Sequence, residues 1–412
     1  MRTVMTAKRL WNGNSLIEDP EVTIEEGRIA SIVSRPKSSL LKSSPSKSDG
    51  GASDGGAESA PGVLDYPGAT LAPAFFDVHI HGAAGHDMME ATPEALSAIG
   101  SFLATRGTGS FLATTVTAGL DATLRAVAGL AKLIEKPELL KTPGKNGQPC
   151  ARPLGIHLEG PFLSHEKCGV QPREHMLTPD VGVFDRLFEA AEGRVRLMTL
   201  APELPGAVEL TAHATSRGVR VSMGHSNANT AETRAAIAAG ATSATHTFNA
   251  MRALDPREPG IMGVVLTTDT VFAELICDGI HTAKEMVRLW YRAKGPERAI
   301  LVTDAMSATG MPDGEYPLGG FAVQVANGRA TARGVLAGSV LTLDRALVNF
   351  VEFTGASLED GLRLLTANPA AMTGMECGAG SLEVGQAANL VAVDASGRLV
   401  ASIVDGRLAG GF

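Results

Sequence analysis

The stretch AFFDVHIHG, residues 74–82, is an apolar run that ends in two histidines and a glycine. It is the first of eight such runs, which alternate with amphipathic, helix-like stretches. The others are SFLATTVT (110–117), PLGIHLEGP (153–161), VRLMTLAPE (195–203), VRVSMGHS (219–226), ATSATHTFN (241–249), VFAELICDG (271–279) and AILVTDAM (299–306). Buried parallel strands are almost continuously apolar, and eight of them alternating with helices is typical of a (β/α)8 TIM barrel. We therefore predict an α/β fold built on this barrel. A doubly wound open sheet is the competing arrangement, but no GxGxxG follows the first run.

Both ends of the chain are predicted to form strands outside the barrel. VTIEEGRIASIV, residues 22–33, alternates apolar and polar residues around a turn, and glycine turns divide the apolar runs of residues 380–410. We expect residues 1–72 and 376–412 to pair into a small β-sandwich domain beside a barrel of residues 73–375.

Composition excludes several classes of protein. The chain has 412 residues and a formal net charge of −8, so it has no basic footprint for nucleic acid. Its four cysteines lack CxxC spacing, which fits a reducing compartment better than a disulfide framework. The N-terminus lacks the apolar run of a signal peptide, and no apolar stretch is long enough to span a membrane. We expect a cytoplasmic protein. Residues 36–62 are rich in Ser, Gly and Pro, which predicts a flexible insertion.

Polar residues gather at the carboxyl ends of the apolar runs, where a TIM barrel builds its active site. His79 and His81 are two positions apart on a predicted strand, so their side chains face the same side and could reach one cation. Glu159, His225 and His246 follow or end three further runs. Each alone is more often a solvated or hydrogen-bonded structural residue. Together they favour a divalent metal site, because carboxylate and imidazole suit Zn²⁺ and Fe²⁺.

Three further residues have both a chemical and a structural interpretation. Asp304, in the eighth run, could deprotonate an attacking water near a cation, or it could cap a helix. His281 follows the seventh run and could hydrogen-bond a developing oxyanion, although it could also simply begin a helix. Arg257 lies in a loop with Pro and Gly, where a guanidinium suits phosphate, but a loop arginine is usually only a solvated charge.

The motifs GIHLEGPF, SMGHS, THTFNAM with REPG, CDGIH, TDAM and VLAGS, in this order, resemble those of N-acetylglucosamine-6-phosphate deacetylases in the amidohydrolase superfamily. The resemblance runs from about Leu71 to Val393 and includes GQAANLVAVD, which is seen across amidohydrolases. It implies metal-dependent deacetylation of N-acetyl-D-glucosamine 6-phosphate to D-glucosamine 6-phosphate and acetate, in amino-sugar catabolism or cell-wall sugar recycling. It also implies a homodimer that binds this small amino-sugar phosphate, with no nucleic-acid or membrane partner.

The resemblance further implies which residues hold metal. Glu159, His225 and His246 look like the ligands of the main ion. Some members of the family lack the first histidine pair and hold one metal. This chain keeps His79 and His81, so the resemblance allows one or two Zn or Fe ions in each subunit.

Catalytic and substrate-binding roles are implied in the same way. Asp304 looks like the catalytic acid and base. The implied substrate contacts are Val170, Gln171, Asn249, Ala250, Arg257, His281, Leu336, Ala337 and Gly338. In the family the arginine can be donated across the dimer. Gln171 stands where several relatives have His, so the resemblance does not define its exact sugar contact.

Two rival functions remain open at this point. The nearest is the same chemistry on another substrate, such as N-acetylgalactosamine 6-phosphate or a cyclic amide. Dihydroorotase-like relatives that cleave cyclic amides typically carry a carboxylated lysine where this chain has Glu159. The second rival is a non-catalytic barrel that binds a sugar phosphate, which loss of a metal ligand or of the catalytic aspartate would indicate. Neither is lost here.

Overall fold

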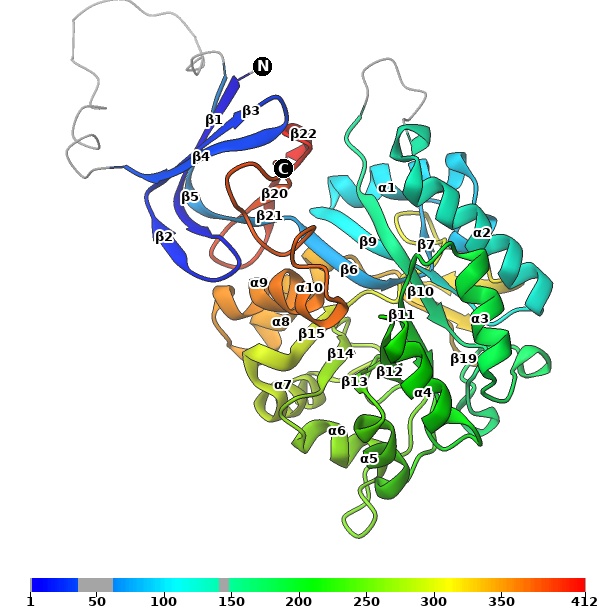
Figure 1. Ribbon diagram of the computed structural model, residues 1–412. Helices are drawn as coiled ribbons and strands as arrows, with labels where there is room; N and C mark the ends of the chain where they lie inside the picture. Colours follow the sequence, from blue (N-terminus) through cyan, green and yellow to red (C-terminus); the bar gives the residue numbers. More distant parts are fainter. Residues whose placement is uncertain (1, 36–61, 141–147, 412) are drawn as a thin grey trace, which may run out of the picture.

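The computed structural model describes residues 2–35, 62–140 and 148–411. Two large sheets organise these residues: a ring of parallel strands surrounded by helices, and a separate sheet beside it (Figure 1). The insertion predicted at residues 36–62 lies, apart from Gly62, outside the described residues.

Eight parallel strands form the barrel and follow one another around it in chain order. They are β6 (Phe75–Ile80), β9 (Thr108–Thr115), β10 (Arg152–Glu159), β11 (Val195–Leu200), β12 (Arg220–Met223), β13 (Ala241–Ala244), β14 (Phe272–Ile276) and β15 (Ala299–Val302). Each strand overlaps one of the eight apolar runs. The predicted TIM barrel is therefore confirmed.

One helix follows each barrel strand and covers the outside of the ring (Figure 1). These helices are α1 (Pro93–Thr105), α2 (Leu120–Glu135), α3 (Val181–Ala190), α4 (Ala207–Ser216), α5 (Thr230–Ala238), α6 (Gly260–Thr267), α7 (Lys284–Arg298) and α8 (Leu343–Thr354), with α9 (Leu358–Leu365) and α10 (Ala367–Thr373) after them. Local sequence sets their ends. Before α5, the Asn229 side chain accepts from the Glu232 amide at 3.0 Å while the Glu232 carboxylate accepts from the Asn229 amide at 2.8 Å. This capping box satisfies donors that the first turn leaves free.

The barrel interior beside the strand ends is polar and hydrogen-bonded. His157 is fully buried, and its Nε2 lies 2.8 Å from Thr199 Oγ1. Thr199 Oγ1 lies 2.7 Å from Thr245 Oγ1, which in turn donates to Ser222 Oγ at 2.7 Å. Burial and the neighbouring charge of His79 hold the pKa of His157 well below its usual value. His157 is therefore a neutral member of this structural network.

Strands β6 and β15 close the ring, and residues on both sides of this seam belong to the predicted site. The Asp304 amide donates to the His79 carbonyl at 2.9 Å. Two residues before His79, the fully buried Asp77 carboxylate accepts from Thr303 Oγ1 at 2.6 Å. Burial raises the pKa of Asp77 to about 7, against the opposing effect of the hydrogen bond from Thr303. The seam is thus held by side-chain as well as backbone bonds.

Replacing Thr303 with valine is expected to lower the free energy of unfolding by about 1–3 kcal/mol, because the buried Asp77 carboxyl would lose its shortest hydrogen bond. Denaturant unfolding measures the change. Thr211→Val is the matched control, since the buried Thr211 hydroxyl donates to the Ala207 carbonyl of its own helix, 2.7 Å away, and makes no other hydrogen bond within the described ranges. An equal loss of unfolding free energy in the two variants would show that the hydrogen bond to Asp77 stabilises the fold no more than an ordinary buried hydroxyl bond does.

The two ends of the chain pair into the separate sheet, as the sequence predicts. Its strand order is β22-β21-β20-β5-β1-β3-β4, with β2 paired to β1. The strands are β1 (Arg2–Trp11), β2 (Leu16–Glu18), β3 (Pro20–Glu25), β4 (Arg28–Ser34), β5 (Val63–Pro73), β20 (Leu390–Val393), β21 (Leu399–Val404) and β22 (Arg407–Gly411). The antiparallel pair β5–β20 joins the N-terminal strands, blue in Figure 1, to the C-terminal strands, red in Figure 1. Buried side chains such as Met5, Leu10 and Leu390 form the core of this sheet.

A small antiparallel sheet between β15 and α8 is absent from the sequence-based prediction. It consists of β16 (Gly314–Leu318), β17 (Phe321–Ala326), β18 (Arg329–Ala332) and β19 (Val335–Leu336). Its buried residues form one cluster with Val116 and Met306, which follow barrel strands. The remaining short elements are β7 (Gly82–Ala83), β8 (His86–Asp87) and the 3₁₀ turns η2 (Met88–Glu90), η3 (Pro137–Leu140), η4 (His165–Lys167) and η5 (Arg173–His175). No helix within the described ranges is long and apolar enough to cross a membrane.

Candidate active site

A cavity of ≈ 330 Å³ opens at the carboxyl ends of the barrel strands. Its lining consists of His81, Val116, Glu159, Gly169, Val170, Gln171, His225, His246, Asn249, Ala250, His281, Asp304, Leu318, Val335, Leu336 and Gly338. All of the residues singled out in the sequence are in this lining except His79, Arg257 and Ala337. The fold therefore gathers side chains from strand ends that are far apart in the chain.

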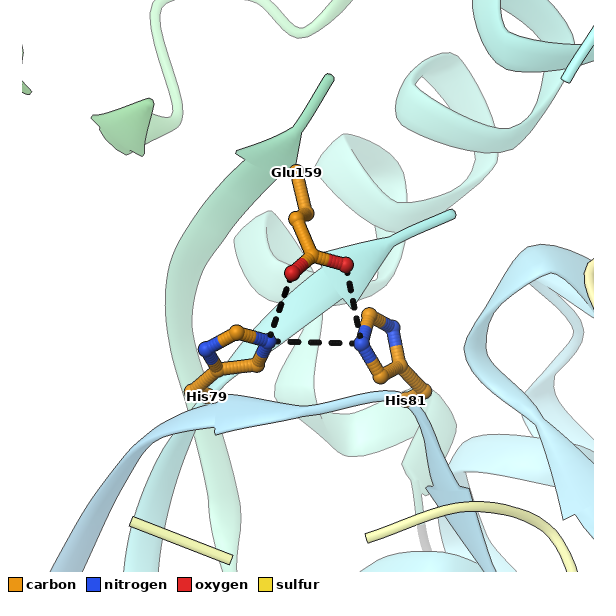
Figure 2. Close-up of side chains that lie close together, drawn as sticks. All are labelled: His79, His81 and Glu159. Atoms are coloured by element: carbon orange, nitrogen blue, oxygen red, sulfur yellow. Dashed lines mark hydrogen bonds and ion pairs between the residues drawn. The ribbon is translucent and has the colours of Figure 1, made fainter. Parts of the chain in front are cut away.

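Glu159, at the end of β10, is shared by two groups of possible metal ligands. Its Oε1 lies 3.3 Å from His225 Nε2 and 3.2 Å from His246 Nε2. On the other side, Oε1 lies 3.4 Å from His79 Nε2 and Oε2 lies 3.2 Å from His81 Nε2. Figure 2 shows His79 and His81 turned toward this carboxylate. Such a set of imidazoles and a bridging carboxylate suits one or two borderline divalent cations.

Backbone carbonyls orient two of these histidines. The Nδ1 atom of His225 lies 2.9 Å from the Lys167 carbonyl oxygen, and that of His81 lies 3.3 Å from the Thr114 carbonyl oxygen. A ring that donates its Nδ1 hydrogen in this way presents the Nε2 lone pair to a metal. Both Nε2 atoms face Glu159. The orientation that ligation requires is thus present in the protein itself.

The electrostatics of the group also fit a cation. Burial acts to raise the pKa of Glu159, but the charge of His79 and hydrogen bonds from His225 and His246 outweigh it and hold that pKa well below its usual range. Burial acts to lower the pKa of His81, yet hydrogen bonds to Asp304 and Glu159 raise it to about 9. The buried carboxylate therefore attracts positive charge, which protons or a divalent cation can supply.

Asp304 lies directly beside this group. Its Oδ1 atom is 3.2 Å from His81 Nε2 and 3.7 Å from His79 Nε2. Burial acts to raise the pKa of Asp304, but the hydrogen bond from His81 and the two histidine charges lower it to about 2. At neutral pH Asp304 is an ionised carboxylate, which is the form that can accept a proton.

Three of these residues have backbone angles that L-amino acids seldom adopt. The φ values are +46° at His225, +30° at His246 and +49° at Asp304. Left-handed backbone at a residue other than glycine costs about 1–3 kcal/mol and persists only where surrounding structure holds it. The bond from the Asp304 amide to the His79 carbonyl, 2.9 Å long, is one such restraint. Each sharp turn comes just after a strand, at the cavity.

A sequence model described as the amidohydrolase family matches residues 70–409. The chain belongs to the amidohydrolase family. It is 35% identical over 410 residues to the N-acetylgalactosamine-6-phosphate deacetylase of Escherichia coli O157:H7, covering 99% of this chain and 100% of the relative. It is 38% identical over 349 residues to the N-acetylglucosamine-6-phosphate deacetylase of Lysinibacillus sphaericus, covering 84% of this chain and 87% of the relative.

A solved structure supports the same placement. The amidohydrolase chain superposes on a variant of the Mycobacterium smegmatis N-acetyl-D-glucosamine-6-phosphate deacetylase in complex with N-acetyl-D-glucosamine-6-phosphate, with a TM-score of 0.85 and 33% identity. The match covers 99% of each chain. It confirms a barrel with an accompanying terminal sheet as the fold of this amidohydrolase.

Gln171 is held between two strand ends of the amidohydrolase barrel. Its Nε2 donates to Glu159 Oε2 at 2.6 Å, and its Oε1 accepts from the Thr117 amide at 2.9 Å. Both ends of the side-chain amide thus contact protein atoms, although Gln171 also lines the cavity. Gln171 therefore hydrogen-bonds Glu159 directly, a contact that the sequence did not predict.

His281 forms a pair with Asp278 at the rim of the cavity. The His281 Nδ1 atom lies 2.7 Å from Asp278 Oδ2, and the His281 amide donates to Asp278 Oδ1 at 2.7 Å. Both side chains are more than nine-tenths buried. The carboxylate therefore fixes the orientation of the imidazole that lines the cavity.

Three predicted site residues lie outside the cavity lining. His79 is fully buried behind His81 and reaches Glu159 from within the barrel. Ala337 is buried in the hydrophobic cluster of the small antiparallel sheet. Arg257 is exposed, and its amide donates to Asp255 Oδ1 at 2.8 Å. Among the residues that the structure describes, no lysine or arginine lines this cavity.

Several residues of the site had no signal in the sequence. Val116, Gly169, Leu318 and Val335 line the cavity, two of them from the small antiparallel sheet. Apolar residues of this kind resemble core residues until the fold is known. Glu274 is different, because a glutamate inside the apolar run VFAELICDG is a signal that could have been noticed.

Proposed function

We propose that this amidohydrolase deacetylates N-acetyl-D-glucosamine 6-phosphate to D-glucosamine 6-phosphate and acetate. The observation that carries the proposal is the pairing of a metal-ligand group centred on Glu159 with an ionised Asp304, whose Oδ1 lies 3.2 Å from His81. The motifs around these residues are those of the deacetylase family, and the chain is 38% identical to one such deacetylase. A metal-dependent amide hydrolase uses both parts, ligands for an electrophilic cation and a base beside them.

Asp304 is the residue that moves protons in this proposal. As a carboxylate it accepts a proton from the attacking water, and as a carboxylic acid it returns that proton to the leaving amine nitrogen. His281, oriented by Asp278, donates a hydrogen bond to the oxyanion that develops on the acetyl carbonyl oxygen. A divalent cation supplies Lewis acidity, which polarises the carbonyl and acidifies water.

The cation that we propose is Zn²⁺ or Fe²⁺. Glu159, His225 and His246 would hold the main ion, and His79 and His81 with the same Glu159 would hold a second. Nitrogen and carboxylate donors support these borderline metals over Mg²⁺ or Ca²⁺, which prefer oxygen ligands alone.

A basic side chain would be expected to bind the phosphate of the substrate. Among the described residues, no lysine or arginine lines the cavity. We propose that Arg257 supplies that side chain from the second subunit of a homodimer. Arg257 is exposed in a loop that follows the cavity residues Asn249 and Ala250. An exposed guanidinium in this loop can reach across an interface, and its planar fork suits a phosphate.

Replacing Arg257 with alanine is expected to raise KM for the 6-phosphate substrate about 10–100-fold with little change in kcat, since a charge-assisted contact contributes about 1.5–3 kcal/mol. The KM for unphosphorylated N-acetylglucosamine should stay unchanged. Arg292→Ala, the same change at an exposed position on α7, is the control. Steady-state kinetics with both sugars tests whether Arg257 binds the phosphate. An unaltered KM for the phosphorylated sugar would show that it does not.

We also propose a cytoplasmic setting and a division into a barrel domain of residues 73–375 and a sheet domain of residues 1–72 and 376–412. The four cysteines, which lack CxxC spacing and so fit a reducing compartment, support the first. The separate hydrophobic cluster of the terminal strands supports the second.

The epimeric substrate is the second candidate. The chain is 35% identical to an N-acetylgalactosamine-6-phosphate deacetylase, and that match covers 99% of this chain. The two sugars differ only at the C4 hydroxyl, so the chemistry at Glu159 and Asp304 would be the same for both.

Acetate release by the metal-loaded protein tests both candidates. The substrates are N-acetylglucosamine 6-phosphate, its galacto epimer and unphosphorylated N-acetylglucosamine, compared by kcat/KM. A preference for the phosphorylated gluco sugar supports the proposal, and a preference for the epimer selects the second candidate. No acetate from any of them, with metal bound, would overturn both and direct the search to cyclic amides.

A further inference from the structure

Glu274 is a buried carboxylate in β14 that the proposed chemistry does not use. Its side chain has no exposed surface, and it does not line the cavity. We propose that Glu274 is a positioning residue for the metal pocket, because it fixes the His79 ring from behind and holds the backbone at His246. This inference rests on the metal pocket of the proposed function, and it adds a residue to which no motif points.

The first contact is with His79. The Nδ1 atom of His79 lies 3.2 Å from Glu274 Oε2, while its Nε2 lies 3.4 Å from Glu159 Oε1 and 3.3 Å from His81 Nε2. A carboxylate can only accept from the ring, so it holds the hydrogen on Nδ1 and leaves the Nε2 lone pair facing the other ligands. Among the described residues, no carboxylate bonds Nδ1 of another ligand histidine: His225 and His81 use backbone carbonyls, and His246 Nδ1 has no partner there.

The second contact is with the segment that carries His246. The His246 amide donates to the same Oε2 atom at 3.3 Å. The Glu274 carbonyl accepts from the Thr247 amide at 2.8 Å and from Thr247 Oγ1 at 2.6 Å. These bonds hold the turn in which His246 has a φ of +30°. One residue thus contacts a member of each ligand group, His79 from one and His246 from the other.

Burying a carboxylate here is costly for the fold alone. The flanking Ala273 and Leu275 are fully buried and apolar, as expected for a barrel strand. Glu274 Oε1 has no hydrogen-bond partner among the described residues. A buried charge with one oxygen unsatisfied destabilises a barrel relative to an apolar side chain of similar size. A carboxylate at this position is understandable if it serves the ligands that it contacts.

Two substitutions separate positioning from packing. Glu274→Met keeps the volume but removes the acceptor, and Glu274→Gln keeps an acceptor oxygen at the same reach. Each protein is freed of metal and titrated with Zn²⁺, and with Co²⁺ while its visible absorption is recorded. We expect Glu274→Met to lower the affinity for the ion at His79 and His81 about 10–100-fold and to change the absorption spectrum of bound Co²⁺. Glu274→Gln should stay close to the parent chain in both measurements.

A matched control is Lys294→Met, which also removes a buried polar group. Lys294 Nζ donates to the Val265 and Thr268 carbonyls at 2.9 and 2.7 Å, away from the ligands. Its metal affinity should equal that of the parent chain. If circular dichroism shows that Glu274→Met does not fold, Glu274→Asp replaces it, with the same expected loss, because its carboxylate is too short to reach His79.

The outcomes are distinct for the two proposals. Unchanged Zn²⁺ affinity and an unchanged Co²⁺ spectrum in a folded Glu274→Met or Glu274→Asp protein would overturn the role of Glu274 and leave the deacetylase intact. An equal loss of metal affinity in Glu274→Met and Glu274→Gln would also overturn this role, because the hydrogen-bond acceptor at position 274 would then make no difference. A parent chain that binds no ion would overturn both.

Discussion

Replacing Asp304 with asparagine is expected to lower kcat about 10²–10⁴-fold, the range that a positioned general acid and base contributes. Asparagine matches the shape of the aspartate but cannot take a proton from water or return one to the amine. The pKa of Asp304, lowered to about 2, means that the carboxylate is the resting form throughout the neutral range. The loss should therefore appear throughout the neutral pH range.

Metal content and fold should survive this change. The ligand group centred on Glu159 does not include Asp304, whose Oδ1 is 3.2 Å from His81. Elemental analysis and thermal unfolding verify both points before kinetics are compared. Asp344→Asn is a suitable control, because Asp344 is also buried but pairs with Arg106 outside the cavity. Near-normal turnover in the Asp304 variant would show that another group carries the proton.

Replacing Glu159 with glutamine is expected to have the largest effect on the metal. The carboxylate lies within 3.4 Å of all four ligand histidines and belongs to both ligand groups. Removing its charge should empty both positions. Because a catalytic ion stabilises the transition state by several kcal/mol, a loss of about 4 kcal/mol corresponds to roughly 10³-fold in kcat.

Ions per chain and turnover are measured together for this variant, before and after incubation with excess Zn²⁺. The parent chain, stripped by chelator, should regain activity when metal is restored, and the Glu159 variant should not. Glu232→Gln serves as the control, since Glu232 only closes the capping box of α5. A Glu159 variant with full metal content would contradict the role of this carboxylate as a ligand shared by both metal positions.

The barrel could be predicted because its strands are short apolar runs with a polar residue at the end of each. Parallel strands meet at one edge, so the positions of Glu159, His225 and His246 along the chain already implied that they converge. The pair His79 and His81 was visible from its spacing, since residues two apart on a strand share a face. These inferences need only periodicity and strand direction.

The remaining parts of the site depend on contacts that no local pattern encodes. The small antiparallel sheet has strands as short as Val335–Leu336, so its supply of Leu318 and Val335 to the cavity gave no signal. Gln171 could be assigned to the sugar from its motif, but its bond to Glu159 depends on how a loop folds back. Arg257 lies outside the cavity lining, so the phosphate contact that its motif implied remains a prediction.

The seam between β6 and β15 has a consequence for how the chain folds. Asp77 and Thr303, which meet there, are 226 positions apart in the chain, and the histidine pair and Asp304 lie beside them on opposite sides. Contacts of such long sequence separation form late, because the loop-closure entropy is paid before the contact stabilises anything. An intermediate with an open seam would lack the contact that places Asp304 beside His81. The visible absorption of Co²⁺ bound in the pocket would thus report on the final stage of refolding.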